Sequence, residues 1–183
     1  MKNELNIMKY IPEISDIKNP DIREKTIKVW EKLWEMSKFE KIEDLPVNPN
    51  TKHSHIIHNR SVIRMALAVA KILEEQHGIK VDTDILISAA ALQDSSKLVE
   101  YQPTQNGIEL SEIGKEFQHG FYAGHIALNM GLPREISVAM ISHTYDNSKF
   151  PPNLISKILF YVDQIDTAAL GVDRWKKTSF IYR

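Results

Sequence analysis

The sequence predicts an all-α protein, a compact bundle of about six helices. Apolar residues recur at helical spacing in successive segments, and glycine, proline or a capping residue bounds these segments. No segment shows the alternation of apolar and polar residues that is typical of a strand. A chain of 183 residues with 43% hydrophobic residues and no long internal linker suits one domain. We therefore expect a single domain over residues 1–183, in which residues 1–18 form an irregular lead-in.

Six segments carry the helical pattern. The predicted helices cover residues 20–40, 56–77, 83–94, 112–130, 134–145 and 153–170. The first opens on Asn19-Pro20, a capping residue followed by proline at the first helical position, and the second stops at Gly78, where a C′ glycine belongs. The third is apolar nearly all round and is therefore expected at the centre of the bundle. Residues 99–111 are expected to form a loop, and the tail from residue 172 is ambiguous.

The composition of the chain indicates which classes of partner it can bind. The chain has 23 basic and 24 acidic residues, so its charge balance predicts no extended surface for nucleic acid or for an anionic membrane. The absence of cysteine excludes disulfides, thiolate metal sites and cysteine nucleophiles. The N-terminal residues lack the apolar core of a signal peptide, and no apolar stretch is long enough to span a membrane. We expect a soluble, cytoplasmic protein that acts on a small molecule, and the sequence gives no indication of its oligomeric state.

Polar side chains interrupt the apolar runs of five predicted helices. They are His58, Gln93, Asp94, His119, His143 and Asp163. Each alone has a simpler explanation, because a single histidine on an apolar face is usually a hydrogen-bonded core residue and a single aspartate is usually a cap. Together they resemble the way in which helical bundles assemble imidazoles and carboxylates around a metal in their cores. The pattern therefore predicts a site for one or two divalent transition metals, with Fe, Mn, Zn, Co and Ni all suited to these ligands.

The order of these segments resembles the HD-domain superfamily. The family pattern is a helical histidine with a valine four residues on, an apolar segment ending in His-Asp-x-x-Lys, often two further histidines, and a closing aspartate. The matching segments are HNRSV at 58–62, AALQDSSK at 90–97, HGFYAGH at 119–125, ISHT at 141–144 and YVDQID at 161–166. The resemblance covers residues 55–170.

The resemblance implies a set of metal ligands. His58, Asp94 and Asp163 match the residues that hold the first metal of the family. In members with two metals the motif aspartate bridges them, and here His119 and His143 match the histidines of the second metal. The resemblance also implies that Asp94 is catalytic together with Lys97, which matches a lysine that contacts phosphate or a bound water.

The chain departs from the family at Gln93, which stands where the motif histidine is expected. A glutamine oxygen can coordinate a hard cation but is a weaker ligand than imidazole for Zn or Fe. Three consequences remain open. The first metal site persists on the other three residues, only the second metal is retained, or the whole site is degenerate.

Several neighbouring residues are secondary candidates. His53 and His55 are expected in a flexible loop that borders the site, with His55 as a substrate contact or weak ligand. Arg60 is a candidate contact for an anionic substrate, although a solvated helix face is the simpler expectation. His125 is expected to be structural. Asp166 is expected as a cap or salt-bridge partner, and less often as an acceptor that orients an imidazole.

The resemblance leaves three functions open. The leading one is a metal-dependent hydrolase of a small molecule, such as a phosphate ester or nucleotide, that uses water activated by the His/Asp metal. The second is a di-iron oxygenase similar to myo-inositol oxygenase, which is less favoured because those enzymes retain the motif histidine. The third is a ligand-binding or regulatory module without catalysis, which the change at Gln93 would explain.

Overall fold

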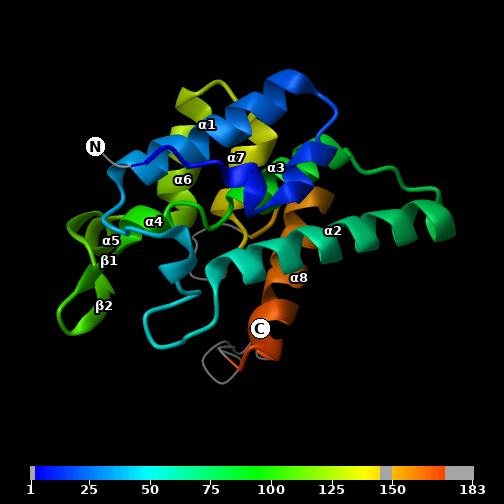
Figure 1. Ribbon diagram of the computed structural model, residues 1–183. Helices are drawn as coiled ribbons and strands as arrows, with labels where there is room; N and C mark the ends of the chain where they lie inside the picture. Colours follow the sequence, from blue (N-terminus) through cyan, green and yellow to red (C-terminus); the bar gives the residue numbers. More distant parts are fainter. Residues whose placement is uncertain (1–2, 145–149, 172–183) are drawn as a thin grey trace.

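The computed structural model describes residues 3–144 and 150–171, and within them the fold is predominantly helical, as predicted (Figure 1). The helices are α1 Pro20–Met36, α2 His55–His77, α3 Thr83–Leu92, α4 Lys97–Glu100, α5 Glu112–Glu116, α6 His119–Asn129, α7 Arg134–Ile141 and α8 Leu154–Ala169. Short 3-10 helices cover Ile7–Lys9, Pro12–Asp16 and Ile42–Asp44. The strands β1 Tyr101–Thr104 and β2 Gly107–Leu110 form an antiparallel hairpin.

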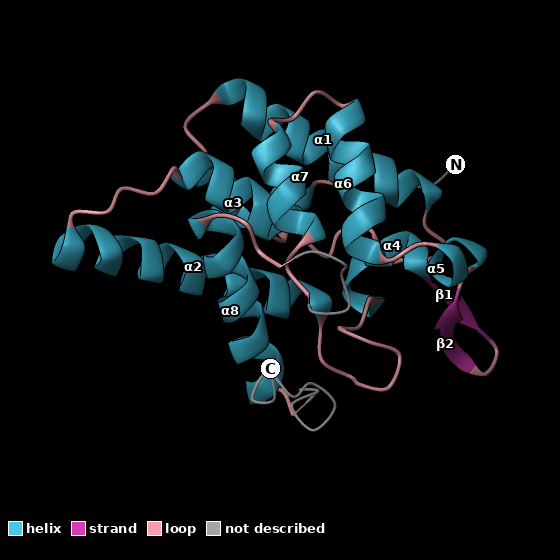
Figure 2. Ribbon diagram, turned by 180° about the vertical axis from the view of Figure 1, so that it is seen from behind, coloured by secondary structure: helices cyan, strands magenta, loops and turns pink. Residues whose placement is uncertain are grey.

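The apolar helix α3 lies in the middle of the bundle, as its composition predicts. Residues 85–92 are all buried, and α3 packs against α1, α2, α7 and α8. In both views of the molecule α3 runs between α1 above and α2 below (Figure 2). Each fully buried aliphatic side chain stabilises the fold by about 1.5–3 kcal/mol relative to an exposed one. The end of α3 is therefore a fixed platform for the residues that follow it.

Capping residues set the helix boundaries where the sequence indicates them. The Asn19 side chain accepts hydrogen bonds from the backbone N–H groups of Asp21 and Ile22 at the start of α1. Gly78 ends α2 in the left-handed conformation, at φ 66°. The first helix is shorter than expected, because Ser37 takes an extended conformation directly after Met36.

Two expectations about the middle of the chain are wrong. Residues 99–111 do not form a loop, because β1 and β2 pair there with Tyr101 opposite Leu110. The helix expected over 112–130 is divided into α5 and α6, because Phe117 and Gln118 are both extended. This break makes His119 the first residue of α6.

The lead-in is more ordered than expected. Its two 3-10 helices bury Ile7, Ile11, Ile14 and Ile17 completely, so this segment is part of the core. These isoleucines lie three or four residues apart, a spacing that indicates a buried helical segment in the sequence itself. The last predicted turn of the helix over 134–145 is also wrong, since α7 ends at Ile141. The ambiguous tail from residue 172 lies outside the described residues.

Across residues 3–144 and 150–171, every helix is too short or too polar to cross a membrane.

Candidate metal centre

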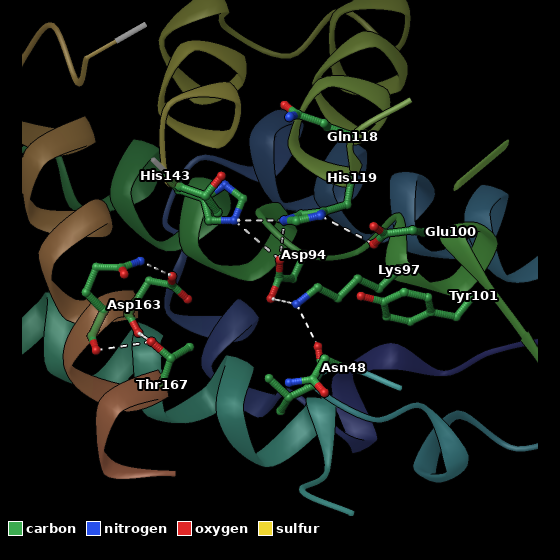
Figure 3. A pocket seen from close by; sticks show the side chains of 13 residues that line it. Asn48, Asp94, Lys97, Glu100, Tyr101, Gln118, His119, His143, Asp163 and Thr167 are labelled. Atoms are coloured by element: carbon green, nitrogen blue, oxygen red, sulfur yellow. Dashed lines mark hydrogen bonds and ion pairs between the residues drawn. The ribbon is translucent and has the colours of Figure 1, made fainter. Parts of the chain in front are cut away.

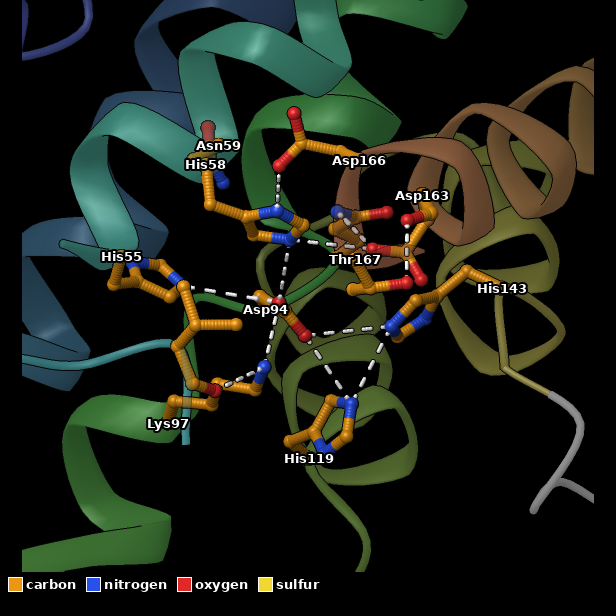
Figure 4. Close-up of polar contacts among 12 residues, drawn as sticks. His55, His58, Asn59, Asp94, Lys97, His119, His143, Asp163, Asp166 and Thr167 are labelled. Atoms are coloured by element: carbon orange, nitrogen blue, oxygen red, sulfur yellow. Dashed lines mark hydrogen bonds and ion pairs between the residues drawn. The ribbon is translucent and has the colours of Figure 1, made fainter. Parts of the chain in front are cut away.

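Five helical segments each bring one imidazole or carboxylate to the same place inside the bundle (Figure 4). His58 lies in the first turn of α2, Asp94 in the turn after α3, and His119 at the start of α6. His143 follows α7, and Asp163 lies in the middle of α8. Four of these side chains are buried, and His119 is partly exposed. The structure thus brings together all five residues that the sequence singles out as metal ligands.

The first cluster consists of His58, Asp94 and Asp163. The Nε2 atom of His58 lies 3.3 Å from Asp94 Oδ2 and 3.2 Å from Asp163 Oδ1. The second cluster consists of Asp94, His119 and His143, in which Asp94 Oδ1 lies 3.2 Å and 3.3 Å from the two Nε2 atoms. The two Nε2 atoms are themselves 3.3 Å apart. Asp94 therefore belongs to both clusters, with one carboxylate oxygen facing each.

These spacings fit shared cations. Ligand atoms about 2.0–2.2 Å from one ion in tetrahedral or octahedral geometry lie about 3–3.5 Å from one another. Buried polar atoms are normally hydrogen-bonded. Within the described part of the chain, however, His58 Nε2, Asp94 Oδ1 and Gln93 Oε1 are buried and have no hydrogen-bond partner. A cation in each cluster would satisfy the first two of these atoms, so the residues present fit one or two divalent metals.

Oppositely charged side chains lie next to one another in the metal centre and shift one another's pKa values. Burial opposes the charge on His58, but the carboxylates of Asp163, Asp166 and Asp94 outweigh it and hold the imidazole pKa well above its ordinary value. Burial likewise opposes the charge on Asp94, but Lys97 and the surrounding imidazoles hold the pKa of this carboxyl well below its ordinary value. Because metal coordination needs neutral imidazole, a cation would displace these protons.

The outer nitrogen of each histidine in the two clusters faces an oxygen atom, through a hydrogen bond in His58 and His143 and an ion pair in His119. Asp166 Oδ2 lies 2.6 Å from His58 Nδ1 and Glu100 Oε2 lies 3.3 Å from His119 Nδ1. The third histidine, His143, contacts the backbone carbonyl of Met140 through Nδ1. These contacts fix the ring orientations and direct every Nε2 atom inward.

Two of these carboxylates have roles that the sequence did not favour or did not show. Asp166 forms a salt bridge with His58, as one expectation had it, and it also takes the less favoured role of orienting an imidazole, while accepting a hydrogen bond from Ser61. Glu100 was missed altogether. The sequence signal is its place three residues after Lys97, but its relation to His119 depends on α4 and on the break before α6, neither of which was predicted.

Lys97 is bound more tightly than the resemblance implies. Its Nζ atom lies 2.8 Å from Asp94 Oδ2 and 2.9 Å from the carbonyl oxygen of Val47. Burial opposes its charge, but Asp94 raises the pKa of the ammonium above its ordinary value. Its first role in this structure is therefore to neutralise Asp94, and its side chain also lines the cavity beside the centre.

Two secondary candidates lie elsewhere than expected. His55 is not a flexible loop residue, because it is the first residue of α2, completely buried with its ring edge-on to Trp30. Burial lowers its pKa to about 3, which keeps the imidazole neutral, and Nε2 lies 4.0 Å from Asp94 Oδ2. The guanidinium of Arg60 pairs with Glu13 at 2.9 Å and is not among the residues that line the cavity, so a contact with substrate there stays a prediction.

Two other histidines named as candidates lie outside both clusters. His53 is exposed in the segment before α2. His125 is exposed on α6 and contacts Asn129, consistent with a structural role.

Gly120 is a positioning residue that sequence reasoning missed. A Cβ atom at this position would lie 2.7 Å from the carbonyl oxygen of Met140 and 3.3 Å from the ring of His143. Only glycine therefore allows α6 to approach α7 closely enough to close the second cluster.

We expect Gly120→Ala to weaken metal binding at the second cluster and to destabilise the fold by about 1–3 kcal/mol, because the added methyl group forces α6 away from α7. Urea denaturation and metal stoichiometry measure the two effects. Leu128→Ala, on the exposed side of the same helix, is the control and should retain the metal. Full metal content in Gly120→Ala would contradict the close approach.

A cavity of about 190 Å³ opens onto the second cluster (Figure 3). Asp94, His119, His143 and Asp163 form part of its wall, whereas His58 lies behind it. The rest of the lining includes Lys97, Glu100 and several uncharged polar side chains, namely Asn48, Gln118, Thr144, Gln164 and Thr167. The arrangement presents one cation site directly to a small molecule and places the other more deeply.

Comparisons with known proteins give one similarity. No protein-family model matches the chain. No solved structure gives a significant match. A curated protein of Methanocaldococcus jannaschii, named as dihydroneopterin 2′,3′-cyclic phosphate phosphodiesterase, is 30% identical over 139 residues. The match covers 69% of this chain and 53% of that protein, so the chain spans about half the length of the curated relative it matches.

Proposed function

We propose that the chain is a metal-dependent phosphoester hydrolase of the HD type. The observation that carries this proposal is the pair of clusters that share Asp94 at the wall of a cavity. Similarity to a protein named as a phosphodiesterase supports phosphoester hydrolysis over the di-iron oxygenase alternative.

Five residues would hold the cations. His119, His143 and Asp94 would hold the cation that faces the cavity, and His58 and Asp163 would complete a deeper site with Asp94. A divalent cation there lowers the pKa of a water molecule and polarises a phosphoryl group.

Neighbouring groups hold the ligands in place. Glu100 Oε2 forms an ion pair with His119 Nδ1, and Gln164 donates a hydrogen bond to Asp163 Oδ2 at 3.0 Å. Lys97 offsets the buried charge of Asp94. These contacts hold the ligands in their positions before substrate arrives, which reduces the reorganisation needed during the reaction.

The similarity to a named phosphodiesterase supports a diester as substrate. Three carboxylates line the cavity, those of Asp94, Glu100 and Asp163. Among the described residues that line it, Lys97 is the only lysine or arginine, and its ammonium is already bound to Asp94. Divalent cations on Asp94 and Asp163 would offset this negative charge and attract the anionic phosphoryl group of the substrate. We therefore propose a small phosphodiester as the substrate class.

Chromogenic esters test this proposal. With added Mn²⁺ or Zn²⁺, we expect kcat/KM for bis(p-nitrophenyl) phosphate to exceed that for p-nitrophenyl phosphate by roughly tenfold or more. His119→Ala should lower it by at least about 100-fold, because it removes a ligand of the cation at the cavity. His125→Ala is the matched control on the same helix and should leave the rate unchanged. Failure of metal-loaded protein to cleave either ester, or an active His119→Ala variant, would overturn the assignment.

Gln93 favours a regulatory module as the second candidate function, because the motif histidine is replaced. In that case the metal-loaded protein would bind a phosphodiester without cleaving it. Calorimetric binding measured beside the hydrolysis assay separates the two functions.

A further inference from the structure

We propose that Gln93 is itself a metal ligand, and that its oxygen makes the first cluster selective for a harder cation than the second. The proposal rests on the metal centre of the proposed function, but not on the reaction. It assigns a working role to the one residue that departs from the HD pattern.

The position of Gln93 directs its side chain into the first cluster. It is the C-cap residue of α3, directly before Asp94, and its side chain is completely buried. Its Nε2 atom lies 3.4 Å from Asp163 Oδ1, the same oxygen that lies 3.2 Å from His58 Nε2. The amide thus borders the atoms that a cation in this cluster would bind.

The hydrogen bonding of this amide is incomplete. The contact to Asp163 is long for a hydrogen bond, and Oε1 has no partner although it is fully buried. A role as a simple hydrogen-bond donor would therefore leave a strong acceptor unsatisfied inside the core. A ligand role gives this oxygen a partner.

A half-turn of the amide about its terminal bond completes the coordination. The two ends of a glutamine amide have nearly the same shape, so the turn exchanges Nε2 and Oε1 without moving the rest of the side chain. The oxygen then stands about 3.4 Å from Asp163 Oδ1. Without a cation, two oxygens at that distance repel each other. With a cation between them, both can bind it, because the spacing is that of two ligands of the same ion.

The resulting ligand sets differ in character. The first cluster offers one imidazole nitrogen, from His58, and three oxygens, from Gln93, Asp94 and Asp163. The second offers two imidazole nitrogens and one oxygen. Oxygen ligands suit Mn²⁺ and Mg²⁺, whereas imidazole-rich sites favour Zn²⁺ and related metals. The chain would therefore hold two different cations, with the harder one in the deeper site.

Metal binding tests this directly. The protein is first freed of metal with a chelator. It is then titrated with MnCl₂ and afterwards with ZnCl₂, while electron paramagnetic resonance measures the concentration of free Mn²⁺. Elemental analysis after gel filtration gives the stoichiometry. We expect the wild-type chain, once one equivalent of Zn²⁺ is bound, to retain one Mn²⁺. Displacement of all Mn²⁺ by that first equivalent of Zn²⁺ would overturn the selectivity.

Three substitutions isolate the amide oxygen. Gln93→Leu removes the ligand and should weaken the retained Mn²⁺ by roughly tenfold or more, and Gln93→His should raise Zn²⁺ affinity at the same site by a similar factor. Gln93→Glu separates a role as metal ligand from a role as hydrogen-bond donor to Asp163. If residue 93 is a ligand, the added negative charge should tighten Mn²⁺ binding and enlarge the rise in Tm that Mn²⁺ causes. If it is only a donor, glutamate removes that donor, and both Mn²⁺ binding and the rise in Tm should decrease.

The control is Gln102→Leu, on β1, where the side chain accepts a hydrogen bond from Lys38 away from the centre. It should match wild type in every titration. Unchanged Mn²⁺ binding in Gln93→Leu, or weaker Mn²⁺ binding in Gln93→Glu, would refute the ligand role. Because these readouts need no turnover, the absence of phosphoester hydrolysis would count against the proposed function alone.

Discussion

Asp94→Asn is expected to remove both bound metals and to lower phosphodiester hydrolysis by at least about 1000-fold. The two carboxylate oxygens of Asp94 face different clusters, 3.3 Å from His58 Nε2 and 3.2 Å from His119 Nε2. Asparagine has the same shape, but it carries no charge and offers only one oxygen. Among the described residues, Asp94 is the member that the two clusters share.

The same variant should also be less stable. Asparagine leaves the buried ammonium of Lys97 with no opposite charge, and breaking a buried ion pair in this way costs about 3–5 kcal/mol. Urea denaturation in the presence of a chelator measures this loss apart from metal binding. Asp21→Asn is the matched control, because that carboxylate forms an exposed pair with Lys25 and should change stability by less than about 1 kcal/mol. Normal metal content in Asp94→Asn would disprove the shared-ligand geometry.

The parts of the fold that follow from local physics could be read from the sequence. The centre of the bundle was predictable because α3 is apolar on every side. The start of α1 was predictable because Asn19 and Pro20 are a cap and a first helical residue. The ligand candidates were visible for the same reason, since polar groups inside apolar runs need buried partners.

What could not be predicted depends on contacts between distant residues. The hairpin over 101–110 pairs residues whose apolar pattern is too weak to identify a strand. The break between α5 and α6 falls at Phe117 and Gln118, neither of which is a proline or glycine that would indicate the end of a helix. This break makes His119 the start of α6. The roles of Glu100 and Asp166 follow only from where α4 and α8 place them beside imidazoles of other helices.

Gln93 shows why the resemblance alone was insufficient. A pattern can report that an expected histidine is missing, but not whether its replacement still reaches the site. Burial, the 3.4 Å contact to Asp163 and the unsatisfied Oε1 are tertiary facts. They place the glutamine side chain at the edge of the first cluster, which leaves its role open to measurement.

Lys97→Met is expected to destabilise the metal-free protein by about 3–5 kcal/mol, because it leaves the buried carboxylate of Asp94 without the ammonium that forms an ion pair with it. Methionine keeps most of the packing of the aliphatic stem while removing the charge. Urea denaturation with a chelator measures this loss. Lys115→Met is the control, since that lysine pairs with Glu112 at an exposed position and should contribute less than about 1 kcal/mol.

The metal-loaded variant should recover much of this stability. The Lys97 ammonium lies 2.8 Å from Asp94 Oδ2, the oxygen that also faces His58 in the first cluster. A divalent cation there supplies the missing positive charge, so saturating Mn²⁺ should raise the Tm of Lys97→Met by more than it raises that of wild type. Equal losses with and without Mn²⁺ would mean that no cation approaches Asp94 Oδ2. The lysine and the metal would then act on separate charges, contrary to the network of opposite charges that the structure places around Asp94.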